Sequence, residues 1–107
     1  MHIVVLITCP DDESARFISH LLLTRRLAAC VNIIPSITSY FWWGKRENRI
    51  HESREVLLLV KTKQSLLREL TRTVKENHQY QIPEIIALPI VGGSKEYARW
   101  MDDETKK

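Results

Sequence analysis

The side chains of this chain that could bind a metal ion are a few histidines, cysteines and acids spread over 107 residues. We take His78, Cys30 and Glu84 as candidate ligands, because imidazole, thiolate and carboxylate groups hold divalent and transition metals in proteins. The sequence contains no Cys-x-x-Cys, His-x-His or His-x-x-x-His pair, which argues against a site formed by one short motif. A strong metal site would have to be assembled from distant segments or from several subunits.

Two of these candidates also have a purely structural interpretation. Cys30 falls in an apolar strand-like segment, where a cysteine usually packs as a small buried thiol. His78 falls at the end of an expected helix, where a charged imidazole would stabilise the helix dipole. Cys9 precedes Pro10 close to an expected helix start, so it could be a reactive thiol with a lowered pKa. For Cys30 and His78, the interpretation as a metal ligand and the structural interpretation both stay open.

A second group of polar residues could form a ligand cleft. Lys61, His78, Tyr80 and Glu84 would make a polar cleft for a small anion or a metal complex if neighbouring subunits brought them together. The alternative for Lys61 is that its aliphatic stem packs on the core while its ammonium group reaches water. The pattern supplies no nucleophile and no oxyanion pocket, so we expect no enzyme activity.

The positions of these residues depend on a regular order of strands and helices. Hydrophobic patterns predict strands at residues 2–8, 29–43, 48–60 and 84–91, with interruptions at Pro35 and Pro89 that require a bulge or a sheet edge. They predict helices at about 11–26 and 63–77, the second capped by Thr62 or Ser65, and a short helix that begins at Ser94.

This β-α-β-β-α-β order predicts an α+β domain of the ferredoxin-like type with an extra C-terminal helix. Right-handed crossovers place both main helices on one face of a four-stranded antiparallel sheet, with the first and third strands at its centre. We expect one domain over residues 1–107, ordered to about 102, with a frayed tail at 103–107. Cys9 and Cys30 then lie on strands that are not neighbours, so both should remain thiols.

The second and third strands form a hairpin that is long and aromatic for so small a domain. A domain of this size buries only roughly two-thirds of the surface that its unfolded chain exposes, so a projecting aromatic ribbon should be covered by another copy of the chain. The residues expected at a subunit interface are aromatic: Tyr40, Trp42, Trp43 and Trp100.

Composition and charge narrow the remaining possibilities. With 44% hydrophobic and 27% charged residues the chain is typical of a globular protein. The net charge of +3 comes from charges of both signs that alternate along the chain, which argues against a nucleic-acid surface. No signal peptide or membrane-spanning stretch is evident, and we expect a soluble, cytoplasmic protein with no membrane partner.

Four blocks of the sequence, in order and at matching spacing, resemble the CutA divalent-cation tolerance family. They are residues 27–35 (LAACVNIIP), 38–45 (TSYFWWGK), 55–62 (EVLLLVKT) and 80–90 (YQIPEIIALPI). The resemblance covers nearly the whole chain. It implies a homotrimer of ferredoxin-like subunits related in fold to PII-type signal proteins, and a role in tolerance of copper and other divalent metals.

The resemblance also implies where copper ligands would fall. In bacterial members the copper ligands are a Cys that matches Ile7 and two adjacent His that match Asn77 and His78. Only His78 keeps the residue type here, and Gln79 replaces the proline that family members carry after this His. We therefore expect weak binding of copper or another divalent cation at clefts between subunits. Two alternatives are a PII-like signalling or scaffold trimer that binds a small anion, and a structural trimer without a ligand.

Overall fold

The computed structural model describes residues 1–44 and 49–107, which form one four-stranded sheet with helices against it. The elements in chain order are β1 His2–Cys9, α1 Asp12–Thr24, β2 Cys30–Trp42, β3 Ile50–Lys63, a 3-10 turn Gln64–Leu66, α2 Leu67–Asn77, β4 Ile85–Pro89 and α3 Lys95–Glu104. All pairings are antiparallel and the sheet order is β2-β3-β1-β4. The predicted ferredoxin-like α+β fold, with β1 and β3 central and an extra C-terminal helix, is confirmed.

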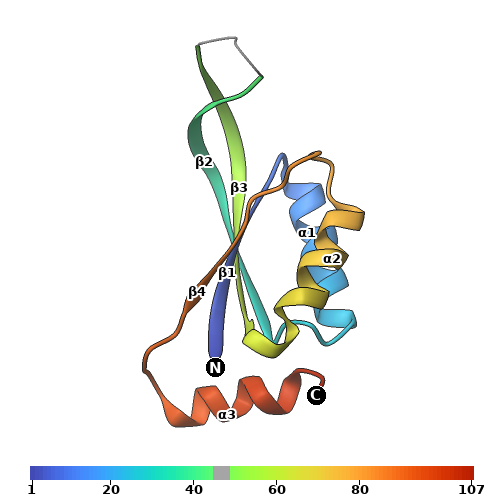
Figure 1. Cartoon of the computed structure of the whole chain (residues 1–107), viewed down its shortest axis with the longest axis vertical. Helices are drawn as coiled ribbons and strands as arrows, with labels where there is room; N and C mark the ends of the chain where they lie inside the picture. The colour runs from blue at the N-terminus through green and yellow to red at the C-terminus, as the bar shows by residue number, and fades with distance from the viewer. Residues whose placement is uncertain (45–48) are drawn as a thin grey trace.

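The helices leave a large part of the sheet uncovered. Figure 1 shows α1 and α2 side by side on one face, while the β2–β3 hairpin extends past them and α3 crosses the opposite end. The described chain is accordingly elongated, with principal extents of 47, 26 and 23 Å. None of the helices in the described ranges is long and apolar enough to cross a bilayer.

The face covered by α1 and α2 carries the hydrophobic core. Successive side chains of a strand point to opposite faces, so alternate residues of the two central strands enter this core. Its fully buried members from the strands and the two helices include Val5, Ile7, Leu58, Val60, Ile18, Leu22, Leu70 and Val74. Each such side chain contributes about 1.5–3 kcal/mol relative to an exposed position.

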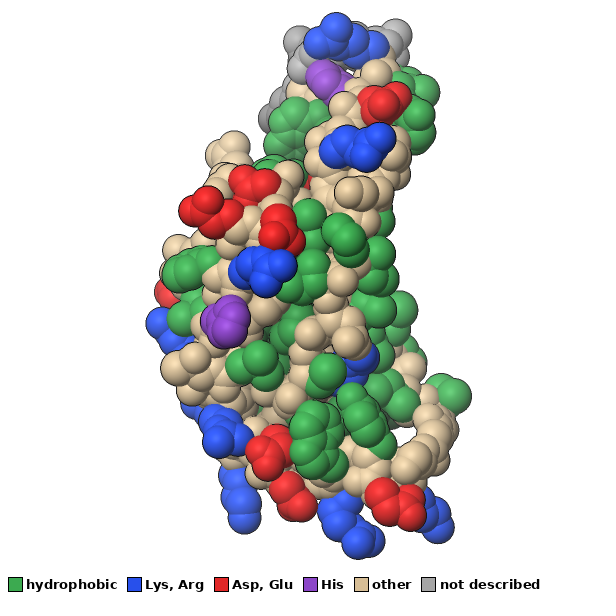
Figure 2. Space-filling model, turned by 180° about the vertical axis from the view of Figure 1, so that it is seen from behind, with side chains coloured by type: hydrophobic (Ala, Val, Ile, Leu, Met, Phe, Trp, Pro, Cys, Tyr) green, Lys and Arg blue, Asp and Glu red, His purple; other side chains and the backbone are tan. Residues whose placement is uncertain are grey.

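The other face, called the open face below, is also apolar but is not covered within the chain. Leu6 lies opposite Leu59 on one side and Ile86 on the other, so these three side chains form a row across the open face. Ile86 and Leu88 are 47% and 46% exposed. Seen from behind in Figure 2, hydrophobic side chains run from the hairpin down towards α3. Within the single chain, helices therefore cover β1 on one face only.

Both prolines that interrupt the strands lie where a missing N–H is tolerated. The β2–β3 register shifts between Ile34 and Ile37, so Pro35 lies in a bulge, and Ser36 in that bulge has a positive φ of 58°. Pro89 lies on β4, which is an edge strand. The predicted bulge-or-edge positions are confirmed.

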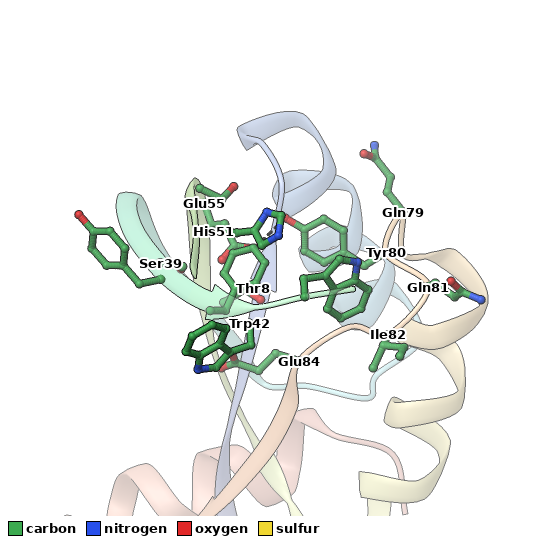
Figure 3. Close-up of a pocket in the computed structure, with 14 residues that line it drawn as sticks. Thr8, Ser39, Trp42, His51, Glu55, Gln79, Tyr80, Gln81, Ile82 and Glu84 are labelled. Atoms are coloured by element: carbon green, nitrogen blue, oxygen red, sulfur yellow. Dashed lines mark hydrogen bonds between the residues drawn. The ribbon is translucent and has the colours of Figure 1, made fainter. Parts of the chain in front are cut away.

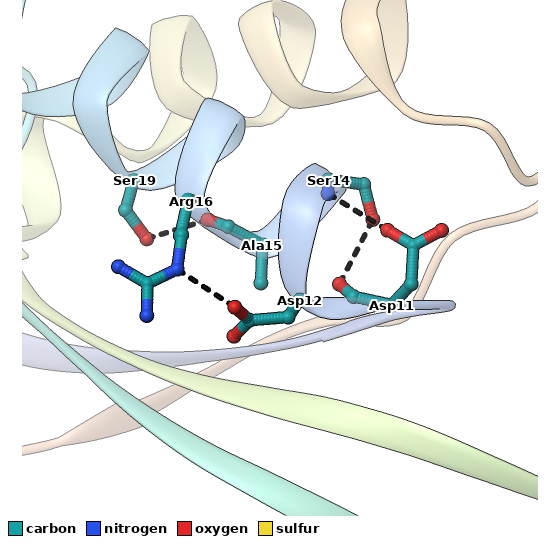
Figure 4. Close-up of polar contacts among 6 residues, drawn as sticks. All are labelled: Asp11, Asp12, Ser14, Ala15, Arg16 and Ser19. Atoms are coloured by element: carbon teal, nitrogen blue, oxygen red, sulfur yellow. Dashed lines mark hydrogen bonds and ion pairs between the residues drawn. The ribbon is translucent and has the colours of Figure 1, made fainter.

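Local polar contacts define the start of α1 (Figure 4). The Asp11 carboxylate accepts a hydrogen bond of 2.8 Å from the Ser14 N–H and caps the helix. This backbone N–H, followed by the Ser14 hydroxyl, lowers the pKa of Asp11. One turn later Arg16 pairs with Asp12 at 2.7 Å. The helix ends at Thr24, two residues before the predicted end, because Arg26 takes a positive φ of 57°.

The start of the second helix differs from the prediction. Neither Thr62 nor Ser65 caps α2, which has no side-chain cap and begins at Leu67 after the 3-10 turn. Thr62 belongs to β3 and is fully buried, and its hydroxyl donates a hydrogen bond of 2.7 Å to the Leu27 carbonyl. The hydroxyl is therefore used to join β3 to the loop after α1.

The C-terminal segment 103–107, expected from the sequence to be a frayed tail, makes several contacts with the domain in this structure. α3 continues to Glu104, and the buried Thr105 donates its hydroxyl to the Met101 carbonyl at 2.8 Å. The Lys106 N–H donates to the Arg26 carbonyl at 3.0 Å, and its ammonium group pairs with Glu69 at 2.8 Å. Contacts with two distant segments hold the tail against the domain.

We predict that Thr62→Val lowers the free energy of unfolding by about 1–3 kcal/mol, because it leaves the buried Leu27 carbonyl without this donor while keeping the volume of the side chain. Urea denaturation measures the change. Thr38→Val on an exposed position of β2 is the matched control and should change stability little. Equal effects of the two variants would contradict the assigned role of the Thr62 hydroxyl.

Candidate functional site

A cavity of about 890 Å³ lies at the base of the β2–β3 hairpin, and we call it the hairpin cavity (Figure 3). Four segments line it: the end of β1 at Thr8, residues 39–42 of β2 with Trp43 just after it, alternate residues His51, Ser53 and Glu55 of β3, and residues 79–82 and 84 in the connection from α2 to β4. Strand alternation places the three β3 residues on the same face as Leu57 and Leu59. The cavity therefore continues the open face towards the hairpin.

Glu55 is the buried carboxylate of this cavity. Only 8% of the residue is exposed, and its Oε2 accepts a hydrogen bond of 2.7 Å from the Tyr80 hydroxyl. Burial, followed by the hydrogen bond to Glu55 and the charge of that carboxylate, raises the pKa of Tyr80. Tyr80 is thus held as a neutral phenol that donates to a charged carboxylate.

Glu84 is a second carboxylate at the same cavity, in a more exposed position. Burial, followed by the negative charge of Glu55, raises its pKa. Within residues 1–44 and 49–107, neither Glu55 nor Glu84 forms an ion pair with a cationic side chain. Two carboxylates in one hollow without a counter-charge favour a cationic ligand.

His78 lies beside this cavity and is the C-cap residue of α2. Its Nε2 is 2.7 Å from the Thr8 carbonyl oxygen, which can only accept, so Nε2 carries the proton. Its Nδ1 accepts the Tyr80 N–H at 3.0 Å, which assigns the neutral tautomer. Both ring nitrogens thus hold backbone groups in place, and a metal ion on either nitrogen would have to displace one of these bonds. The geometry also gives no support to a charged His78 that acts on the helix dipole.

The two thiols are unpaired, as predicted, and lie at opposite ends of the sheet. Cys9 is fully buried, and burial, followed by the charges of Asp11 and Glu55, raises the pKa of its thiol to about 11. The interpretation of Cys9 as a reactive thiol of lowered pKa is therefore wrong, since the desolvated thiolate is disfavoured. Cys30 is partly exposed at the start of β2.

Lys61 and Cys30 belong to the other end of the molecule. They are cross-strand partners on β3 and β2, and Lys61 lines a second cavity of about 530 Å³ under α3. Lys61 lies six positions after Glu55 on β3, which is about 20 Å along an extended strand. Within one chain the structure brings Tyr80 and Glu84 together beside His78, and it does not bring Lys61 to them.

The same separation applies to the candidate metal ligands. Glu84 lines the hairpin cavity and His78 lies next to it, whereas Cys30 lies at the far end of β2. Among the described residues, no group of three or more His, Cys, Asp or Glu side chains could hold a metal ion. The described ranges of one chain therefore bring the two carboxylates of Glu55 and Glu84 to one cavity, without a third such donor beside them.

The aromatic residues expected at a subunit interface are exposed in the single chain. The exposed fractions are 68% for Tyr40, 65% for Trp42, 49% for Trp43 and 40% for Trp100. Tyr40, Trp42 and Trp43 line the hairpin cavity, while Trp100 lies on α3 against Tyr97, with ring centroids 5.3 Å apart. The predicted hairpin tip includes Lys45 and Arg46, which lie outside the described residues.

Sequence reasoning missed Glu55 and the acceptor role of the Thr8 carbonyl. Glu55 directly precedes the apolar run of β3, and a period-two pattern through Leu57 and Leu59 would have placed it on the open face. Its pairing with Tyr80 across 25 residues has no sequence signal, because it depends on the path of the connection between α2 and β4.

Comparison with known proteins identifies relatives along the whole chain. Residues 3–104 match the model of the family described as CutA1 divalent ion tolerance protein. The chain is 47% identical over 105 residues to the divalent-cation tolerance protein CutA of Thermus thermophilus, which covers 98% of this chain and 99% of that protein. It is 44% identical to the chloroplastic protein CutA 1 of Oryza sativa, over 98% of this chain and 58% of that protein.

Solved structures agree with these relatives. A CutA1 crystal structure from Oryza sativa superposes with a TM-score of 0.94 at 43% identity, covering 99% of this chain and 94% of that chain. The Thermus thermophilus protein also gives a TM-score of 0.94, at 46% identity, over 99% of this chain and all of that chain. The chain spans a little over half the length of the chloroplastic relatives.

We predict that His78→Ala lowers the free energy of unfolding by about 1–3 kcal/mol, because both the Thr8 carbonyl and the Tyr80 N–H lose a partner. His78→Gln keeps a donor that can reach Thr8 and should recover part of the loss. Chemical denaturation measures both, with His20→Ala on an exposed position of α1 as control. No difference between the His78 and His20 variants would show that the two bonds contribute nothing.

Proposed function

The chain belongs to the CutA1 divalent ion tolerance family, and on that premise we propose that it is a homotrimeric protein that binds copper or another divalent cation weakly. The observation that carries the proposal is the pair Glu55 and Glu84 in the hairpin cavity, with no cationic partner among the described residues. Oxygen donors suit hard divalent ions, and two carboxylates alone make a weak site. Further donors would come from a neighbouring subunit at an intersubunit cleft.

The residues proposed from the sequence as metal ligands enter this site in different ways. Glu84 is the principal ligand of the proposal, and Glu55 joins it through the oxygen that Tyr80 does not hold. His78 serves as a positioning residue for Tyr80, and it ligates only if a ring nitrogen leaves its backbone partner. Cys30 contributes only if another subunit brings it to the cavity, and a thiolate there would favour copper(I) over copper(II).

The trimer is supported by the surface that the single chain leaves uncovered. The open face has a row of apolar side chains across three strands, and the hairpin adds exposed Trp42 and Trp43. Contiguous apolar surface of this kind marks an association site. Three copies related by a threefold axis would bury the open faces against one another and place hairpin cavities at the boundaries between subunits.

The remaining parts of the proposal concern activity and location. The family and the Thermus thermophilus relative are named for divalent-cation tolerance, and we propose a binding role without catalysis, with neither nucleic acid nor a membrane as partner. We place the protein in the cytoplasm, although the relatives include chloroplastic proteins and one described as periplasmic. The chloroplastic and periplasmic locations are those of the relatives.

The alternative is a signalling or scaffold trimer that binds a small anion, and one observation favours it. Lys61 forms no ion pair within the described ranges and lines the second cavity, next to Ser94 and Lys95 at the start of α3. A rise in melting temperature with inorganic phosphate, measured without metal, would favour this alternative over the metal site. A trimer stabilised by neither ligand would have a structural role only.

We predict that copper(II) binds the protein saturably. The Glu84→Gln variant should bind copper(II) about tenfold more weakly, because the substitution removes a charged ligand. Binding should also weaken as the pH falls, since protonation neutralises Glu84, and this should begin above the usual carboxyl range because the pKa of Glu84 is raised. Isothermal titration calorimetry with and without reductant measures both effects. Glu76→Gln on an exposed position of α2 is the matched control. Unchanged affinity in Glu84→Gln would remove the carboxylate pair from the metal site.

We predict that the protein has three times the mass of one chain in solution and that Leu59→Lys shifts it towards single chains, because a lysine ammonium cannot be buried in an apolar interface without a partner. Multi-angle light scattering at micromolar concentration measures the mass. Leu23→Lys, on an exposed position of α1, should leave the mass unchanged. A wild-type protein that runs as a single chain would contradict the trimer.

A further inference from the structure

Three cations form a row along the outer side of α2, and we call Arg68, Arg72 and Lys75 the cationic row. They lie at i, i+4 and i+7, so with 3.6 residues per turn they share one side of the helix. All three are exposed. The buried residues of α2 lie on its opposite side and are Leu70, Thr73 and Val74. The row therefore points away from the core.

The cationic row stays accessible when the open face is covered. α2 lies with α1 on the other face of the sheet (Figure 1), and its buried side packs on the core. The proposed trimer buries the open faces against one another, which leaves the outer side of the helix layer in water. A partner can therefore reach the row in a single chain and in the trimer alike.

The stability of the fold gives no reason for two of these cations. Arg68 lies in the first turn of α2, where the helix dipole disfavours a positive charge. Arg72 follows four residues later, and like charges at this spacing repel each other. Only Lys75, in the last turn, suits the dipole. Part of the row therefore costs stability, which favours a role in binding.

Neighbouring acids do not neutralise the cationic row. None of its three members forms an ion pair within residues 1–44 and 49–107. Glu69 pairs instead with Lys106 at 2.8 Å. This hydrogen bond, together with the charges of Lys106 and Arg72, lowers the pKa of Glu69. Glu76 follows Arg72 by one turn and does not pair with it. The row thus presents unpaired positive charge to the solvent.

The dimensions and surroundings of the row select an acidic segment of a protein as its partner. Seven residues at 1.5 Å each make the row about 10 Å long, and acids at i, i+4 and i+7 of another helix repeat at the same rise. Two acids of α2, Glu69 and Glu76, run alongside the row. They would repel a broad polyanion such as nucleic acid, whereas basic residues beside the acids of a protein segment would pair with them. The net charge of +3 is also small for a nucleic-acid surface.

We propose that the cationic row of α2 binds an acidic helical segment of another protein, with carboxylates at i, i+4 and i+7 opposite Arg68, Arg72 and Lys75. The two guanidinium groups suit carboxylates because each can donate two parallel hydrogen bonds. This surface goes beyond the proposed metal binding and uses none of the residues of the hairpin cavity. Failure of one proposal therefore leaves the other intact.

Fluorescence anisotropy with two labelled helical peptides of equal composition tests this surface on the wild-type protein. One peptide carries glutamates at i, i+4 and i+7, and the other carries them dispersed around the helix. The patterned peptide should bind saturably and more weakly as salt is raised, and the dispersed peptide about fivefold more weakly. Saturable binding that is absent, or equal for the two peptides, would overturn the proposal.

Two double variants locate the binding on α2. Arg68→Gln with Arg72→Gln should weaken binding of the patterned peptide about fivefold, because two charge pairs are lost. Arg16→Gln with Arg99→Gln, on exposed positions of α1 and α3, removes the same charge elsewhere and should leave binding unchanged. Circular dichroism checks that both variants are folded. Equal losses in the two variants would show an effect of net charge only and contradict the cationic row.

Thermal unfolding and a nucleic-acid probe separate this proposal from its alternatives. Arg68→Gln should raise the melting temperature or leave it unchanged, because it removes a cation that the helix dipole and Arg72 both disfavour. A lower melting temperature would assign Arg68 a structural role and contradict the argument. A labelled single-stranded oligonucleotide should bind more weakly than the patterned peptide. Binding as tight as that of the peptide would make the row a nucleic-acid surface and overturn the proposed partner.

Discussion

The sheet is apolar on both faces where β1 pairs with β3 and β4, and the two main helices can cover only one of these faces. Core residues such as Val5 and Leu58 lie under α1 and α2, while Leu6, Leu59 and Ile86 form a row on the face that no helix covers. Apolar area exposed to water costs about 25 cal/mol per Å², so this second face favours association. The proposed trimer and the position of its ligand clefts both depend on this asymmetry.

The hairpin cavity is the place where the open face becomes polar. β3 carries Leu59 and Leu57 and then Glu55 on the same face, so a buried carboxylate follows directly on the apolar row. A buried carboxylate is costly unless it is hydrogen-bonded, and Tyr80 supplies that bond. Glu84 adds a second charge at the more exposed side. Because neither carboxylate has a cationic partner among the described residues, a bound cation would stabilise this arrangement.

His78 connects this cavity to the centre of the sheet. One ring nitrogen donates to the Thr8 carbonyl near the end of β1. The other accepts from the Tyr80 N–H, and the phenol of the same tyrosine donates to Glu55. The histidine therefore positions the ligand-binding segment without occupying the ligand site. This explains how a residue that was proposed as a metal ligand can matter for the site through its backbone contacts alone.

The sequence by itself determined the order of elements, the central position of β1 and β3, the bulge at Pro35 and the unpaired thiols. These features follow from the period of the hydrophobic residues, the chemistry of proline and the handedness of the crossovers, which are local or topological constraints. The grouping of Tyr80 and Glu84 beside His78 could be anticipated from their short spacing. Only the tertiary structure decided that Glu55 completes that group, that Lys61 and Cys30 lie at the other end of the sheet, and that residues 103–106 pack on the domain. Contacts between residues 25 or more positions apart depend on how the elements pack in space, and no periodicity of the chain records them.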